Sequence, residues 1–355
     1  MKIIQRYFTT TLVSYSMLAL SVLVALFCFF SLIDQLEETG KGSYGVTQAI
    51  TYVILTVPRL SYELFLIGAV IGSMTSLGIM AQHSELAVIR TAGVSKLKLS
   101  LILIKSGLLL VLIALFIGEV LAPICEEKAQ HMRSMALTDQ IALKTKFGFW
   151  ARDANSYINI RKVLPDGKVE EVYIYEFDEN DELRSSIHAE SGEYGDGKWL
   201  LENISQSTIS KESVSSQHIE LASWDSLLEP EMFNLLIVNP EYLTFLGLLN
   251  YIEFLKQNAQ DSQRYEQALW AKLVRPLSIL AMIVLAVPLV RGTARTTAVG
   301  QRVFIGALIG IVFHIINQMS SHLGVVYNIP AIFSVTVPTI ILSALTLYML
   351  QRQGT

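Results

Sequence analysis

Long apolar runs separated by short polar intervals form the main pattern of this chain. The run 7–33 contains no charged residue, and the segment 303–351 contains no Asp, Glu, Lys or Arg. A helix that crosses a bilayer needs about 20 apolar residues. The first run is longer than the core of a secretory signal and has no small-x-small cleavage site, so we expect an uncleaved span. In total, the pattern predicts six membrane spans, at 10–33, 51–81, 99–122, 273–290, 303–320 and 332–350.

Between the third and the fourth span, the pattern changes to short segments of alternating polarity. Val172 and Ile174 alternate with Tyr173 and Tyr175, which is typical of strands with one apolar and one solvated face. Strands of this number and spacing suit a sandwich, a jellyroll or an open barrel. They are predicted at 148–153, 156–163, 169–177, 183–190, 198–210 and 214–224, with turn residues between them.

The chain therefore divides into four parts. We expect an α-helical membrane protein with six transmembrane helices and an inserted all-β, jellyroll-like domain between the third and the fourth helix. The expected parts are three spans in 1–125 with a short polar helix at 83–95, the β domain in 126–238, an amphipathic helical connector in 239–265, and three spans in 266–355.

Basic residues in the short connections predict the orientation of these parts, because Lys and Arg accumulate in cytoplasmic loops. The loops on the other side hold Lys41, with Arg59 near a span end. We therefore expect an inner-membrane protein with both termini and 83–95 in the cytoplasm, and with the β domain in the periplasm. The cytoplasmic side holds nine basic residues: Lys2, Arg6, Arg90, Lys96, Lys98, Arg291, Arg295, Arg302 and Arg352.

Composition narrows the function further. A hydrophobic content of 52% and a mean hydropathy of +0.46 are typical of an integral membrane protein. The segment 150–235 holds 18 Asp or Glu against 7 Lys or Arg, which disfavours nucleic-acid binding because that needs positive surface. The β domain suits either an apolar groove for acyl chains or a self-contained core.

No motif in the chain indicates catalysis. A Walker sequence, a dinucleotide-binding glycine pattern, a nucleophile elbow and a cluster of metal ligands are all absent from the sequence. We therefore assign no catalytic residue, cofactor or metal to this chain. If it performs transport, the energy must come from a partner.

The polar interval between the second and the third span predicts a short helix. Ser84 suits its N-cap, and Gly93 suits its end. Leu86 and Ile89 fall on one face at helical spacing, together with Ala92 or Gly93. Such a helix can dock into a groove on a partner or can be an ordinary solvated loop helix.

Few ionisable residues fall within the predicted spans. Arg59 and Glu63 are four residues apart, so they can form an ion pair, or they can meet a charged substrate near the interface. Lys105 can extend toward the interface. Glu119, like His314 and Asn317, suits polar contacts between helices better than a transport site.

An ordered set of residues resembles the permease family of the lipopolysaccharide exporter, LptF/LptG, and looks more similar to its G-type members. The three spans, β domain and three spans of this chain match that family's architecture. The residues that carry the resemblance are Asp34-Gln35-Leu36, Gly42-Ser43-Tyr44, Val57-Pro58-Arg59, Met80-Ala81-Gln82, Ser84-Glu85-Leu86, Ala92-Gly93, Gly118-Glu119, Ala122-Pro123, Leu255-Lys256, Asp261, Arg264-Tyr265, Trp270-Ala271-Lys272, Pro276-Leu277-Ser278, Arg302-Val303, Val312-Phe313, Gln318, Val326-Tyr327 and Ile329-Pro330.

The resemblance implies a transport assembly rather than an enzyme. It implies a heterodimer with an LptF-like permease, two copies of an LptB-like cytoplasmic ATPase that bind ATP and Mg²⁺, and an LptC-like single-span protein beside the first helix. The assembly would extract lipopolysaccharide from the periplasmic leaflet of the inner membrane. It would pass the lipid along a periplasmic β-jellyroll bridge toward the outer membrane.

The resemblance also assigns roles to single residues. Lateral gates in the first and fifth spans would include Phe27, Phe30, Phe313 and Asn317. Arg59 and Arg133 match basic positions near the phosphorylated headgroup, and Lys41 is a further candidate. The coupling helix that meets the ATPase would include Ser84, Glu85, Leu86, Ile89 and Arg90, with Glu85 facing the ATPase.

One region departs from the family pattern. Related G-type subunits often carry lysines around the outer end of the first span, where this chain has Ser31, Glu37 and Glu38. We hypothesise that Lys41 or Arg59, or a divalent cation that bridges carboxylate and phosphate, replaces them. Lipid binding that stays unchanged when Glu37 and Glu38 are replaced by Lys, with and without Mg²⁺, would contradict this hypothesis.

Two other functions fit part of the pattern. The chain can be a membrane-anchored periplasmic scaffold, whose spans only hold the β domain. It can also be an ABC permease of the lipoprotein-release or mechanotransmission type. That type usually has four spans, so the six predicted here favour the exporter. Co-purification of a stoichiometric ATPase would separate a transporter from a scaffold.

Overall fold

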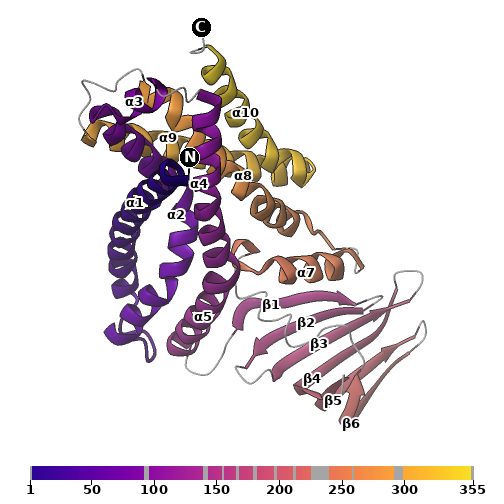
Figure 1. The fold of residues 1–355 in the computed structure, drawn as a ribbon. Helices are drawn as coiled ribbons and strands as arrows, with labels where there is room; N and C mark the ends of the chain where they lie inside the picture. The colour runs from indigo at the N-terminus through magenta and orange to yellow at the C-terminus, as the bar shows by residue number, and fades with distance from the viewer. Residues whose placement is uncertain are drawn as a thin grey trace.

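The computed structural model places a helical bundle beside a β-sheet, with the C-terminus and the short helix α3 at the end of the bundle away from the sheet (Figure 1). It describes residues 2–91, 96–138, 143–153, 156–164, 168–178, 182–195, 198–210, 213–224, 240–257, 260–291 and 299–352.

Six helical segments are long and apolar enough to span a membrane, so the six predicted spans are confirmed. The first two are α1 (Lys2–Glu37) and α2 (Val46–Gln82), and the last three are α8 (Gln263–Arg291), α9 (Val299–Val326) and α10 (Ala331–Arg352). The helices extend beyond the apolar runs, because polar residues end the hydrocarbon-facing segment without breaking the backbone hydrogen bonds.

The helix α2 is the centre of the bundle. It is mostly buried, and it packs against α1, α8 and α9. Small residues allow these close approaches. A Cβ atom on Gly72 would lie 2.3 Å from Ser16 of α1, and a Cβ atom on Gly78 would lie 2.5 Å from Arg302 of α9.

The third membrane helix continues far past its apolar run. It consists of α4 (Lys96–Phe116), one π-helical turn (Ile117–Leu121) and α5 (Ala122–Thr138). Residues 126–138, which we assigned to the β domain, are therefore helical. Hydropathy marks where a helix leaves the apolar layer, whereas Glu, Lys, Ala and Gln in α5 keep good helix propensity.

The inserted domain is one antiparallel sheet of six strands, which confirms an all-β domain between the third and the fourth membrane helix. Each strand pairs with its neighbours in sequence, so the described strands form a meander. The strands are β1 (Leu143–Asp153), β2 (Ser156–Val163), β3 (Val169–Phe177), β4 (Leu183–Gly195), β5 (Lys198–Ile209) and β6 (Val214–Trp224).

One face of the sheet is apolar, and α7 covers part of it. Ile158, Ile174 and Ile187 lie opposite one another on neighbouring strands, and the first two are fully buried. Tyr251 and Phe254 of α7 (Phe245–Gln257) belong to the same core as the sheet residues. The connector helix α7 therefore occupies part of the apolar face that we considered as an acyl-chain groove.

Candidate functional site

The predicted coupling helix exists as α3 (Glu85–Thr91), a two-turn helix directly after α2. Ser84 lies just before it and accepts hydrogen bonds through its carbonyl oxygen from the N–H groups of Ala87 and Val88, at 3.0 and 3.1 Å. Its φ angle of 61° is left-handed, unlike the extended backbone of an ordinary N-cap. Ser84 thus forms the turn between two helices. Residues 92–95, with the predicted end at Gly93, lie outside the described residues.

The structure places Leu86 and Ile89, which share the predicted face of α3, against this chain rather than toward a partner. Leu86 and Ile89 are partly buried and pack against the core of the membrane bundle, so they anchor α3 to its own chain. Val88 points outward and is 65% exposed. The surface left for a partner therefore includes Val88, which was not among the contact residues predicted from helical spacing. The side chain of Arg90 lies outside the described residues.

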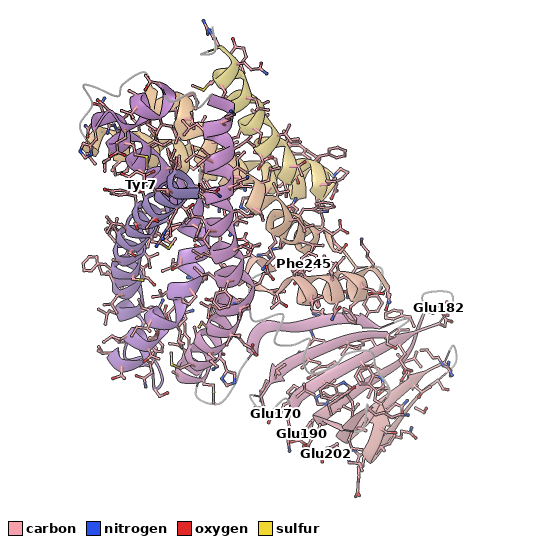
Figure 2. The ribbon with its side chains drawn as sticks, viewed as in Figure 1. Tyr7, Glu170, Glu182, Glu190, Glu202 and Phe245 are labelled. Carbon is pink, nitrogen blue, oxygen red and sulfur yellow. The ribbon has the colours of Figure 1, made fainter. Side chains whose placement is uncertain are left out.

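Glu85 is held at the first turn of α3 by residues on two sides. The Tyr7 hydroxyl donates a hydrogen bond to Glu85 Oε2 at 2.9 Å, and His83 Nδ1 lies 3.8 Å from Glu85 Oε1. Tyr7 is in the part of α1 that packs within the bundle, far from the sheet (Figure 2). This contact links the first membrane span directly to α3.

Two of the three predicted lipid-binding cations share one carboxylate. Lys41 Nζ lies 3.6 Å from Glu38 Oε2, and Arg133 Nη2 lies 3.8 Å from Glu38 Oε1. The guanidinium group of Arg133 also lies over the Tyr52 ring, 5.5 Å from its centroid. The sequence argument treated Glu38 as a departure from the family pattern, and the structure places it between the two cations.

The third cation, Arg59, lies in a neighbouring acidic environment. Its Nη1 is 3.4 Å from Glu126 Oε1, and its Nε is 3.9 Å from Glu63 Oε1. The side chain of Glu126 is buried, and Gln130 donates a hydrogen bond to it at 2.7 Å.

Gln130 connects the two groups into one polar network, because its Nε2 also lies 3.2 Å from the Tyr52 hydroxyl. We call the connected side chains the outer polar network. Its members lie on the loop after α1, on α2 and on α5: Glu38, Lys41, Tyr52, Arg59, Glu63, Glu126, Gln130 and Arg133. Each of its cations is near a carboxylate, so an incoming anion must compete with Glu38, Glu63 or Glu126.

A second polar junction ties the third span to the fourth. Lys272 of α8 lies 2.5 Å from Glu119 Oε1, and the Phe245 N–H donates to Glu119 Oε2 at 2.8 Å. Phe245 begins α7, between the bundle and the sheet (Figure 2). Glu119 is thus a contact between elements, and its position in a π-helical turn exposes the carboxylate to both donors.

Tyr242 also joins the connector to the membrane helices. It lies in the short 3-10 helix η2 (Pro240–Tyr242), and its hydroxyl donates to Glu63 at 2.5 Å. Burial and the adjacent Glu63 carboxylate raise the pKa of the Tyr242 phenol far above its usual range, so Tyr242 stays a proton donor at neutral pH.

The predicted gate residues occupy two different environments. Phe27 and Phe30 are 44% and 54% exposed on α1. Phe313 is buried in the bundle core, and the buried Oδ1 of Asn317 has no hydrogen-bond partner among the described residues. Within the chain, α2 packs against both α1 and α9, so it separates the two predicted gate helices.

Arg275 was not among the predicted site residues, although it lies within the predicted fourth span. Its guanidinium group stacks on Tyr62, 4.1 Å from the ring centroid, and it lines a cavity between α2, α8 and α9. The signal was present as an arginine inside an apolar run. Among the described residues, no group of three His, Cys, Asp or Glu side chains is arranged to hold a metal ion.

Comparisons with known proteins agree with this architecture. The family model of the lipopolysaccharide export system permease LptF/LptG matches residues 6–352. The lipopolysaccharide export system permease protein LptG of Haemophilus influenzae is 31% identical over 352 residues, which cover 99% of this chain and 98% of the relative. Its counterpart from Escherichia coli K12 is 32% identical over 356 residues and 99% of both chains. The chain belongs to the LptF/LptG family of lipopolysaccharide export permeases.

Proposed function

We propose that this chain is the G-type permease subunit of an ATP-driven lipopolysaccharide exporter. The match to the LptF/LptG family over nearly the whole chain carries the proposal. Six helices of membrane-spanning length support it against the four-span lipoprotein-release type. The chain would extract the lipid from the periplasmic leaflet of the inner membrane and pass it to a β-jellyroll bridge.

The chain would obtain its energy through α3. The exposed face of α3 offers Val88 to a partner, while Glu85 stays connected to the first span through Tyr7. We propose that two LptB-like ATPases, which carry the ATP and Mg²⁺, serve an LptF-like permease and this chain. Glu85 would then exchange its hydrogen bond with Tyr7 for a contact with the ATPase. Ser84 and Arg90 stay predicted members of this contact.

The lipid headgroup would meet the outer polar network. Arg133, Lys41 and Arg59 lie together at the sheet-side end of α1, α2 and α5. Phosphate groups bind well to guanidinium and ammonium groups through charge-assisted hydrogen bonds. Because carboxylates already neutralise these cations, we propose that the headgroup displaces Glu38 or reaches it through a divalent cation.

The lateral gates would form between two permeases. Because α2 separates α1 from α9 within one chain, we propose that α1 of this chain meets the corresponding fifth span of an LptF-like partner. Phe27 and Phe30 would be the gate residues on α1. An LptC-like single-span protein would insert beside the same helix.

The orientation follows from the basic residues. We propose that both termini and α3 are cytoplasmic and that the sheet is periplasmic. The C-terminus and α3 lie at the end of the bundle opposite the sheet (Figure 1), which supports this arrangement. The sheet would receive the lipid's acyl chains on its apolar face, beside α7.

The test is co-purification and coupling of the ATPase. The full assembly is purified with wild-type chain or with Glu85→Arg, and lipid-dependent ATP hydrolysis is measured. We expect Glu85→Arg to abolish lipid transport while the protein stays inserted in the membrane. The control is Glu253→Arg on the exposed side of α7, which reverses the same charge away from α3. Full coupling in Glu85→Arg would refute the docking role, and the lack of any stoichiometric ATPase would favour a scaffold.

A further inference from the structure

Arg275 is a charged residue near the start of the apolar part of α8, as the third residue of the predicted span 273–290. It lies twelve residues after Gln263, the first residue of α8, which is about 18 Å along the axis at about 1.5 Å per residue. The segment Gln263–Val290 is a membrane-span candidate. A charge within a membrane span is costly, and it usually faces an ion-pair partner, a water-filled cavity or a ligand.

The neighbours of Arg275 do not neutralise its charge. Its Cζ atom lies over the Tyr62 ring, 4.1 Å from the ring centroid, and no carboxylate among the described residues forms an ion pair with it. Lys272, one helical turn earlier, is paired with Glu119, and Arg59 is paired with Glu126. Arg275 therefore differs from Lys272 and Arg59.

Arg275 lines a cavity of about 500 Å³ between α2, α8, α9 and η2. A second guanidinium group, that of Arg264, lines the same cavity, and it also has no ion-pair partner among the described residues. The wall includes the carboxylates of Glu63 and Glu241. Glu63 is already engaged by Tyr242 at 2.5 Å and by Arg59 at 3.9 Å.

The cavity continues as a smaller one of about 40 Å³ between the same helices. Arg275 and Asn317 line both. The buried Oδ1 of Asn317 has no hydrogen-bond partner among the described residues. Unsatisfied polar atoms of this kind are rare in protein interiors unless a ligand or water completes them. This observation, independent of the charge of Arg275, also points to an occupant.

The chemistry of the cavity favours a phosphate group. A guanidinium group that stacks on an aromatic ring leaves its edge N–H groups free, and this planar fork matches the oxygens of a phosphate. A volume of this order suits a polar headgroup but not a whole exported glycolipid. The apolar wall residues Ala268, Val325 and Val326 suit the first carbons of an attached chain.

We propose that the cavity is a second anion site, which binds a lipid phosphate through Arg275 and Arg264. It adjoins the outer polar network, with which it shares Glu63, but its two arginines are not members of that network, whose cations are paired. The proposal needs the membrane placement of the chain but not the export cycle. The phosphate can belong to the exported glycolipid or to a phospholipid of the surrounding bilayer, because both present the same group.

The test measures lipid binding to the full purified assembly by native mass spectrometry. The three probes are lipopolysaccharide, phosphatidylglycerol and inorganic phosphate. We expect Arg275→Gln to weaken binding of at least one lipid about tenfold or more, since a hydrogen-bonded pair of charges is lost. Arg275→Lys should restore part of it, because it keeps the charge but not the fork.

The matched control is Arg161→Gln. Arg161 also stacks on a tyrosine, Tyr173, at 4.6 Å, but it lies on the sheet. A loss confined to lipopolysaccharide assigns the site to the exported lipid, and a loss confined to phosphatidylglycerol assigns it to the bilayer. Equal binding of all three probes by Arg275→Gln and wild type would overturn the proposal.

Thermal unfolding without added lipid gives an independent measurement. If Arg275 awaits an anion, Arg275→Gln removes an uncompensated charge and should raise the delipidated protein's Tm. Added lipid should then stabilise wild type but not the variant. A lower Tm in Arg275→Gln that added lipid does not change would indicate a structural contact and would also contradict the proposal. A failure of ATPase coupling would leave both measurements unaffected.

Discussion

At the scale of single residues, Glu38 forms ion pairs with two of the cations that we propose bind the lipid headgroup. It lies 3.6 Å from Lys41 and 3.8 Å from Arg133, and these partly exposed pairs are each worth about 0.2–1 kcal/mol. In the proposed headgroup contact, a phosphate would take the place that Glu38 now occupies. The spacing from Glu38 to Lys41 is visible in the sequence, but the contact with Arg133 requires the fold of α5 against α1 and α2.

Glu38→Gln should strengthen lipopolysaccharide binding by a few-fold, because Arg133 and Lys41 lose a competing charge. Binding is measured on the purified assembly by photo-crosslinking to the lipid. Glu37→Gln is the control, since Glu37 is exposed and has no described ion pair. Two results together would instead support a bridging cation: weaker lipid binding in Glu38→Gln, and an increase of lipid binding on addition of Mg²⁺ that occurs only in wild type.

The second residue-scale prediction concerns Glu171 on β3, outside the membrane helices. The Tyr173 hydroxyl donates a hydrogen bond to Glu171 at 3.0 Å, and His188 Nε2 lies 3.2 Å from the same carboxylate oxygen. These contacts lower the pKa of Glu171. A carboxyl with a lowered pKa stabilises the fold above its unfolded pKa of about 4.3, and this contribution is lost as the pH falls through the folded value.

Glu171→Gln should therefore reduce the loss of sheet stability between neutral pH and about pH 3. Urea unfolding of the full chain, followed by tryptophan fluorescence, provides the measurement, because Trp199 is buried in the sheet core. Glu176→Gln on the same strand is the control. An identical acid dependence in wild type and Glu171→Gln would show that the two hydrogen bonds do not matter for stability.

At the scale of elements, α3 has one face that anchors it to the bundle and one exposed face, which we propose binds the ATPase. Leu86 and Ile89 pack inward, whereas Val88 is exposed. Val88→Asp should weaken ATPase co-purification by about tenfold or more, since a buried charge at a protein interface is costly, and it should leave the Tm unchanged. Leu86→Ala should lower the Tm instead. Pull-down and thermal unfolding measure these effects, and a Val88→Asp variant that keeps its ATPase would exclude this face.

The elements also show where sequence reasoning succeeds. Apolar runs predict the six spans, because burial in lipid requires them, and alternation predicts the strands of the sheet. Hydropathy does not predict where α5 ends at Thr138, since helix propensity continues after the apolar layer ends. Nor does it predict the π-helical turn at 117–121, within which Glu119 contacts Lys272 and Phe245.

Some contacts of the site residues could be predicted from the sequence, and others depend on the fold. Arg59 and Glu63 are close in sequence, so their pairing could be predicted from helical spacing. Glu126 was not predicted, because its contact with Arg59 joins two helices that are 67 residues apart. Arg275 was visible as an intramembrane arginine, but its cavity exists only after α2, α8 and α9 have packed.

At the scale of the whole molecule, the bundle has a buried centre and an exposed apolar rim, where the proposed second permease would fit. The helix α2 is buried among its neighbours, while α1 and α9 present large exposed apolar side chains. Exposed apolar surface on a membrane helix contacts lipid or another helix. Because α2 separates α1 from α9, each of them is available to a partner on its outer side.

A photo-crosslinking amino acid at Phe30 should therefore form adducts with a partner permease and with lipopolysaccharide, because Phe30 is 54% exposed on α1. The same substitution at Leu64, which is 7% exposed on α2, should form only intramolecular adducts. Mass spectrometry of the adducts distinguishes these outcomes.

Adducts at Phe30 with bilayer phospholipid alone would place α1 on the outer rim of the assembly, away from any gate. Adducts with the partner that diminish when nucleotide is trapped on the ATPase would connect gate movement to α3, since the Tyr7–Glu85 contact joins the same helix to the coupling helix.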